Sequence, residues 1–123
     1  MTSFSLKNTR DFLNAKEVSR RENHEKLLSQ ARADLAVILD VITRASEARR
    51  VYHWGSLLDG KHFNEGSDID LAVSGISTET LLRLQKETEA LSAFPVHLVR
   101  YEQVPESYRE MIDRFGKVIY ERT

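Results

Sequence analysis

The chain has 123 residues, enough for one globular domain with an ordinary hydrophobic core. The formal net charge is −1 and there is no cysteine, which argues against a nucleic-acid-binding surface and excludes disulfides and thiolate metal sites. No apolar run reaches the roughly 18 residues of a membrane-spanning helix, and the N-terminus lacks the apolar stretch of a signal peptide, so a cytoplasmic protein is expected.

The N-terminal part of the chain changes character at Leu27. Residues 1–26 are polar and mixed in charge; we expect a short helix near residues 9–18, and residues 16–26 fit either an exposed helix or a linker. From Leu27 onward, apolar residues recur at spacings of three and four, which is typical of an amphipathic helix. These residues are Leu28, Ala31, Leu35, Ile38 and Ile42. The sequence therefore divides into an N-terminal extension, residues 1–26, and a domain, residues 27–123.

Two strands joined by a loop are expected next. Residues 51–54 form a strand that enters Gly55, and residues 67–73 form the second strand. The segment between them, residues 57–66, contains two glycines and fits a loop or a short helix.

Helices and strands then alternate to the end of the chain. We expect a helix capped by Ser77 or Thr78, a strand over residues 95–100, a helix opened by Pro105 and closed by Gly116, and a strand over residues 117–121. The apolar residues of the last helix are Tyr108, Met111, Ile112 and Phe115. This order predicts an α/β or α+β domain with a small mixed sheet flanked by helices.

The segment from Gly55 to Asp70 carries the chemistry. Asp68 and Asp70 are two residues apart in a predicted strand, so they share one face. Two acids on one face repel each other and are costly to desolvate, and a divalent cation such as Mg²⁺ or Mn²⁺ removes that cost. Gly55 lets the backbone approach a ligand, and a helix starting after Ser56 would favour a phosphate.

This segment resembles the signature of the minimal nucleotidyltransferases in the DNA polymerase β-like superfamily. The matching residues are Gly55, Ser56, Gly60, Ser67, Asp68, Asp70 and Leu71. The resemblance implies the polymerase β-like fold over about residues 27–121, preceded by a helical extension. It implies that Gly55 and Ser56 hold the nucleotide phosphates and that Asp68 and Asp70 bind Mg²⁺ or Mn²⁺.

The resemblance also implies an activity and a partner. The activity would be transfer of a nucleoside monophosphate from ATP or another nucleoside triphosphate to an acceptor hydroxyl. Small members of the family act as antitoxins of HEPN–nucleotidyltransferase pairs, so the implied partner is a HEPN-type toxin, with a homodimer as the other candidate. The alternative hypothesis is a degenerate nucleotidyltransferase fold that serves as a partner-binding module.

Two departures from the family pattern fall in the loop. Asp59 stands where the family has an arginine, so a positive charge near the phosphates becomes negative. Lys61 lies two residues on, and it either compensates in nucleotide binding or is a surface lysine. Between Ser56 and Asp68 there are 11 residues, one more than usual, which indicates a remodelled loop.

The third departure is His97, which stands in the place of the family's third carboxylate. Losing that acid weakens a second metal position, because Mg²⁺ prefers oxygen ligands. His97 is expected to face the acidic pair if the strands are neighbours. It then acts either as a catalytic general base for the attacking hydroxyl or as a partner of Asp68 or Asp70. Trp54 is expected in the core, with contact to a nucleobase as the alternative.

Overall fold

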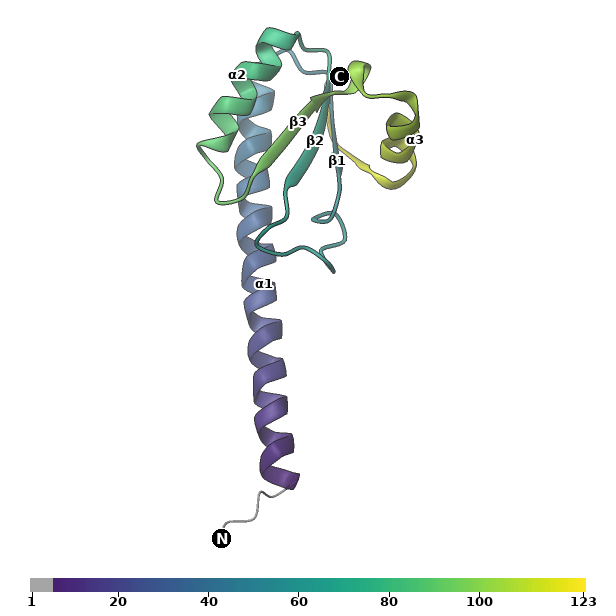
Figure 1. Cartoon of the computed structure of the whole chain (residues 1–123). Helices are drawn as coiled ribbons and strands as arrows, with labels where there is room; N and C mark the ends of the chain where they lie inside the picture. The colour runs from purple at the N-terminus through teal and green to yellow at the C-terminus, as the bar shows by residue number, and fades with distance from the viewer. Residues whose placement is uncertain (1–5) are drawn as a thin grey trace.

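The computed structural model describes residues 6–123 as a four-stranded sheet, one long helix and two shorter helices (Figure 1). The helices are α1 (Leu6–Ala45), α2 (Thr78–Glu89) and α3 (Glu106–Phe115). The strands are β1 (Arg50–Trp54), β2 (Ile69–Ser74), β3 (Val96–Arg100) and β4 (Lys117–Glu121), with a 3₁₀ turn, η1 (Tyr101–Gln103), after β3. The predicted small mixed sheet flanked by helices is confirmed.

The sheet has the strand order β3-β2-β1-β4. β1 runs antiparallel to both β2 and β4, whereas β2 and β3 are parallel. Because side chains alternate along a strand, the sheet has two different faces. Ile69, Leu71 and Val73 point to one of them, and Asp70 and Ala72 point to the other.

One face of the sheet is sealed by α1 and α2 (Figure 1). The buried residues of this core come from the sheet, from α1 and α2, and from the loops: Ala31, Ile38, Ile42, Val51, Leu57, Phe63, Ile69, Leu71, Val73, Leu84, Phe94, Val96 and Leu98 are among them. α2 begins where the sequence predicted, since the Ser77 hydroxyl accepts a hydrogen bond from the Thr80 N–H at 3.1 Å.

The opposite face is covered only in part, by α3. The Tyr52 and Tyr101 rings stack with centroids 4.5 Å apart. The Tyr101 hydroxyl donates to Asp113 of α3 at 2.7 Å, and the Arg109 guanidinium lies 5.5 Å from the Tyr101 ring centre. Ile112 is the buried residue through which α3 packs on this face.

The N-terminal helix differs from the prediction. α1 is one continuous helix of 40 residues rather than the short helix expected near residues 9–18, and of the two readings of residues 16–26 the exposed helix is confirmed. Residues 16–26 contain no glycine or proline and are rich in lysine, arginine and glutamate, which favour helix even when exposed. An ion pair between Arg20 and Glu17, at 3.2 Å, adds local support.

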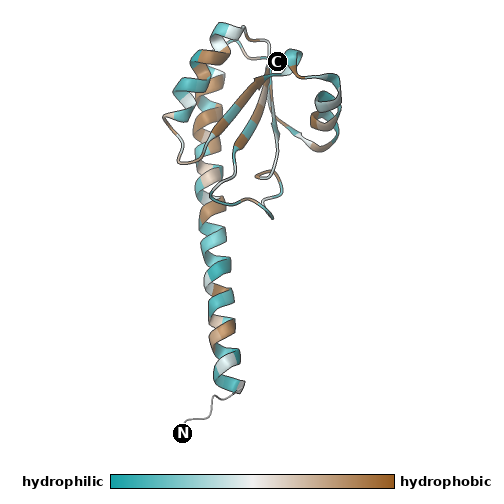
Figure 2. Ribbon diagram, in the orientation of Figure 1, coloured by the Kyte–Doolittle hydropathy of each residue, from teal (hydrophilic) through white to brown (hydrophobic). Residues whose placement is uncertain are grey.

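The first half of α1 extends beyond the sheet as a helical arm, residues 6–22 (Figures 1 and 2). Residues 10–23 are all exposed, and most of the arm is hydrophilic. His24 connects α1 to the loop before β2, since its Nε2 lies 3.2 Å from the Phe63 carbonyl oxygen. Within residues 6–123, no helix combines the length and the apolar character that crossing a membrane requires.

Candidate active site

Three side chains lie in a row across the open face of the sheet. In the strand register, Asp70 of β2 pairs with Trp54 of β1 on one side and with His97 of β3 on the other. His97 Nδ1 lies 3.3 Å from Asp70 Oδ1, and the Trp54 and His97 rings are 6.3 Å apart. His97 therefore faces Asp70 of the acidic pair, as expected for neighbouring strands, while its catalytic role stays a prediction.

Asp70 is the carboxylate at the centre of this row. Its side chain is 15% exposed, and burial raises its pKa above the ordinary value. The hydrogen bond and charge of His97 act in the opposite direction, and the negative charge of Asp68 raises the pKa further. Asp68 is exposed and lies one residue before β2 begins. The repulsion expected between the two acids is therefore present.

Gly55 brings the backbone directly against Asp70. Its φ is +87°, a conformation that glycine adopts easily and other residues rarely do. A Cβ atom at this position would collide with Asp70 Oδ2. The signature glycine is thus required both by the turn at the end of β1 and by the position of the carboxylate.

The loop after Gly55 contains no helix, so the helix N-terminus that would have favoured a phosphate at Ser56 is not formed. The Gly60 N–H donates to the Ser56 carbonyl oxygen at 3.1 Å, which closes a single turn that does not continue. Asp59 explains why: its Oδ1 accepts the Lys61 N–H at 2.9 Å, a local bond that competes with helix formation. Of the two readings of residues 57–66, the loop is confirmed.

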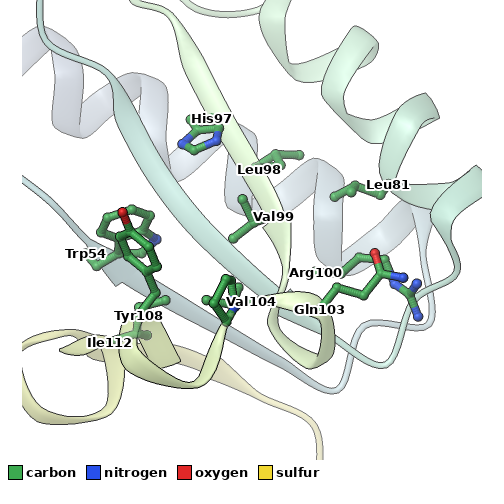
Figure 3. A pocket seen from close by; sticks show the side chains of 11 residues that line it. Trp54, Leu81, His97, Leu98, Val99, Arg100, Gln103, Val104, Tyr108 and Ile112 are labelled. Carbon is green, nitrogen blue, oxygen red and sulfur yellow. The ribbon is translucent and has the colours of Figure 1, made fainter. Parts of the chain in front are cut away.

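Two cavities open on either side of Trp54. The first, here called the β3–α3 cavity, has a volume of about 450 Å³ and is lined by Trp54, His97, Val99, Arg100, Gln103, Val104 and Tyr108, among others (Figure 3). The second, the Gly55 cavity, has a volume of about 520 Å³ and is lined by Trp54, Gly55, Leu58, Asp59, Met111 and Phe115. Trp54 lines both cavities, and its Nε1 has no hydrogen-bond partner among the described residues.

Several apolar residues of α3 line these cavities. Ile112 is buried, but Tyr108, Met111 and Phe115 are exposed, and Phe115 is 67% exposed. The spacing of apolar residues along a helix fits a core contact or a cavity wall equally well, and only the packing of α3 distinguishes the two. Lys61 is exposed and does not belong to the lining of either cavity, so its nucleotide-binding role stays a prediction.

The donor set fits a cation that is shared with a substrate. Within residues 6–123, no cluster of three or more histidine, cysteine, aspartate or glutamate side chains is placed to hold a metal by itself. Mg²⁺ is usually held by one or two carboxylates together with substrate phosphates and water. Asp70, supported by the exposed Asp68, supplies that kind of incomplete set.

Comparison with known proteins agrees with this geometry. Residues 33–123 match the sequence family described as "Polymerase beta, Nucleotidyltransferase". The chain belongs to this nucleotidyltransferase family. A solved structure described as a minimal nucleotidyltransferase is 31% identical over 73% of this chain and 93% of its own, with a TM-score of 0.60.

Two further structures share the fold at lower identity. A toxin–antitoxin with AMP-PNP is 20% identical over 74% of this chain and 73% of its own, with a TM-score of 0.58. The structure of a tri-AMPylated Shewanella oneidensis HEPN toxin in complex with MNT antitoxin is 17% identical over 74% of this chain and 72% of its own, with a TM-score of 0.59. No protein of curated function matches the sequence.

Proposed function

We propose that residues 27–123 form a nucleotidyltransferase domain that transfers a nucleoside monophosphate from a nucleoside triphosphate, ATP in the first instance, to an acceptor hydroxyl. Residues 1–26 would be an extension outside the site. The observation that carries the proposal is the approach of Gly55 to Asp70, where a side chain at position 55 would collide with the carboxylate. A turn suited to phosphate and a carboxylate suited to a cation thus meet at one point.

The chain's own residues would divide the work of the reaction. Gly55 and Ser56 would hold the triphosphate, and Asp68 and Asp70 would hold Mg²⁺ or Mn²⁺, which when bound neutralises phosphate charge. The acceptor oxygen bonds to the α-phosphorus, the bond from that phosphorus to the bridging oxygen breaks, and pyrophosphate leaves with the electron pair. The hydroxyl proton would leave on the side of His97, which stands in the place of the family's third carboxylate.

The acceptor is proposed to be a partner protein. Two structural neighbours are toxin–antitoxin complexes, one of them with AMP-PNP and the other with a tri-AMPylated HEPN toxin. A HEPN-type toxin that receives AMP from this chain is the partner that these neighbours favour. A homodimer would instead place the acceptor hydroxyl on a second copy.

Label transfer tests the activity. The protein is incubated with Mg²⁺, ATP labelled at the α-phosphate and the product of the adjacent gene, and labelled protein is separated by electrophoresis. We expect transfer that Asp70→Asn lowers by about 100-fold or more, since one preorganised charge is lost from the reacting centre. Asp40→Asn, the same change at an exposed α1 carboxylate, should transfer as the wild type does. No transfer to this partner or to the chain itself would contradict the proposal.

The His97–Asp70 contact favours a second candidate, a partner-binding module with a degenerate site. A protonated imidazole 3.3 Å from the carboxylate can balance its charge without a cation. Calorimetry with Mg²⁺ and AMP-PNP separates the two candidates. Binding that Asp70→Asn removes supports the enzyme, whereas no binding, together with capture of the adjacent gene's product, supports the module.

A further inference from the structure

Beside the phosphate turn lies a cavity to which the proposed function gives no role. The Gly55 cavity, about 520 Å³, is formed by the end of β1, the loop after it and α3. This volume is within the range of small-molecule sites. We propose that the cavity binds the nucleobase of the nucleoside triphosphate and that Asp59 selects bases carrying an amino group, a proposal that rests on the proposed function.

The position of the cavity follows from Gly55. This residue forms part of the cavity wall and also lies directly against Asp70. A triphosphate held at the turn would therefore lie beside the Gly55 cavity, and the proposal places its nucleoside end in that cavity. The β3–α3 cavity lies on the other side of Trp54 and is lined by His97, the side that the proposed function gives to the acceptor.

The lining of the cavity suits a flat aromatic ligand. Trp54 and Phe115 contribute aromatic rings, while Leu58 and Met111 contribute apolar surface. Phe115 is 67% exposed, which is a large apolar surface to leave beside a phosphate site. Stacking of a base on an aromatic side chain contributes about 1–3 kcal/mol, and the ring of any base can provide it.

Asp59 supplies the selectivity. It is the single charged residue in the cavity lining, and its Oδ1 accepts the Lys61 N–H, which fixes the carboxylate in the loop. An ionised carboxylate only accepts hydrogen bonds. Adenine and cytosine offer an amino group, and guanine offers an amino group beside a ring N–H. Uracil flanks its one ring N–H with two carbonyl oxygens, which a carboxylate repels.

The base-binding part is tested by comparing two probes in the full chain. MgATP and magnesium tripolyphosphate are titrated separately while the fluorescence of Trp54, the chain's single tryptophan, is recorded, with calorimetry in parallel. Phe115→Ala should lower the affinity for MgATP about tenfold and leave the affinity for magnesium tripolyphosphate unchanged. Phe12→Ala removes an equally exposed phenylalanine (66%) from the helical arm and should change neither.

The selectivity is tested by replacing MgATP with MgUTP. MgUTP should bind about tenfold more weakly than MgATP to the wild type, the factor expected from one repulsive polar contact. The asparagine amide of Asp59→Asn can donate as well as accept a hydrogen bond. The affinities for MgATP and MgUTP should therefore differ by no more than about twofold in this variant. Asp40→Asn should keep the tenfold difference in affinity between MgATP and MgUTP that is expected of the wild type.

Several outcomes would overturn the proposal. If MgATP binds no more tightly than tripolyphosphate, or if Phe115→Ala leaves the affinity for MgATP unchanged, the base lies elsewhere. If Phe115→Ala instead converts a dimer to a monomer in light scattering with nucleotide affinity intact, the cavity is covered by a second copy. If neither probe binds, both the proposed function and the base site are wrong. If tripolyphosphate binds and MgATP binds no more tightly, only the base site is wrong.

Discussion

Gly55 and Asp70 depend on each other, because backbone and carboxylate share a space in which a methyl group does not fit. Gly55→Ala must relieve both the positive φ and the collision with Asp70. We expect the free energy of unfolding to fall by about 1–3 kcal/mol and MgATP affinity to fall tenfold or more. Urea denaturation and calorimetry measure these two effects.

Gly66 provides the matched control for that change. A Cβ atom there would lie 3.3 Å from Asn64 Oδ1, on an exposed loop without positive φ. Gly66→Ala should therefore leave MgATP affinity within about twofold of the wild type. Equal effects of the two substitutions would show that the approach of Gly55 to Asp70 has no special part in binding.

His53 occupies the face of the sheet opposite to the site. It is 5% exposed, and its Nε2 has no hydrogen-bond partner within residues 6–123. Burial lowers the pKa of His53 to about 4, and the positive charges of Lys117 and Arg32 contribute in the same direction. The folded protein therefore keeps this side chain neutral at pH values where the unfolded chain binds a proton.

The resulting pH dependence has a definite sign. Below the ordinary pKa of 6.5, His53 binds a proton in the unfolded chain but not in the folded protein. The free energy of unfolding therefore falls as pH decreases from 6.5 toward 4. This group accounts for roughly 3 kcal/mol over that window. His53→Gln should flatten the curve of unfolding free energy against pH by that amount. The raised pKa of Asp70 changes stability with pH in the opposite direction, but it is present in both the wild type and His53→Gln. Parallel curves of unfolding free energy against pH for the two proteins would therefore show that His53 is not responsible.

At the scale of elements, the helix ends that local sequence signals mark are the ones that could be predicted. Ser77 caps the start of α2 through a side-chain hydrogen bond, and Pro105 and Gly116 flank α3, so local sequence signals predict these helix ends. The sequence leaves residues 16–26 open between helix and linker, because an exposed helix of charged residues has no apolar stripe to reveal it. The apolar residues of α3 are predictable from the sequence but their exposure is not, because the sequence does not show how far a helix is covered.

The helical arm gives the prediction that belongs to this scale. Deleting residues 1–22 removes the helical arm, whose residues 10–22 are all exposed, and keeps the His24 contact with the Phe63 carbonyl oxygen. Far-UV circular dichroism at 222 nm should fall by about a quarter, following helix lengths of 40, 12 and 10 residues, while unfolding free energy changes by less than about 1 kcal/mol.

Ile38→Ala is the contrasting change within the same helix. Ile38 is fully buried in the core, and its truncation should cost about 2–5 kcal/mol. If deletion of the arm destabilises the protein as much as Ile38→Ala does, the arm is covered in solution by another chain.

At the scale of the whole molecule, the candidate site was predictable in part. The two carboxylates, the glycine turn and the approach of His97 to Asp70 all follow from strand alternation and from neighbouring strands. The cavities on either side of Trp54 do not follow, because they depend on how α3 is held over the sheet by Tyr101 and Asp113. Those contacts join segments whose pairing no local pattern specifies.

The length of α1 also determines how the molecule moves in solution. A helix of 40 residues is about 60 Å long, whereas a compact domain of this chain length has a radius of gyration of about 14 Å. A monomer of 14.2 kDa with such a projection experiences more hydrodynamic drag than a sphere of equal mass and leaves a size-exclusion column early. Its elution volume can thus coincide with that of a compact dimer, so absolute mass by light scattering is the appropriate measure of its oligomeric state.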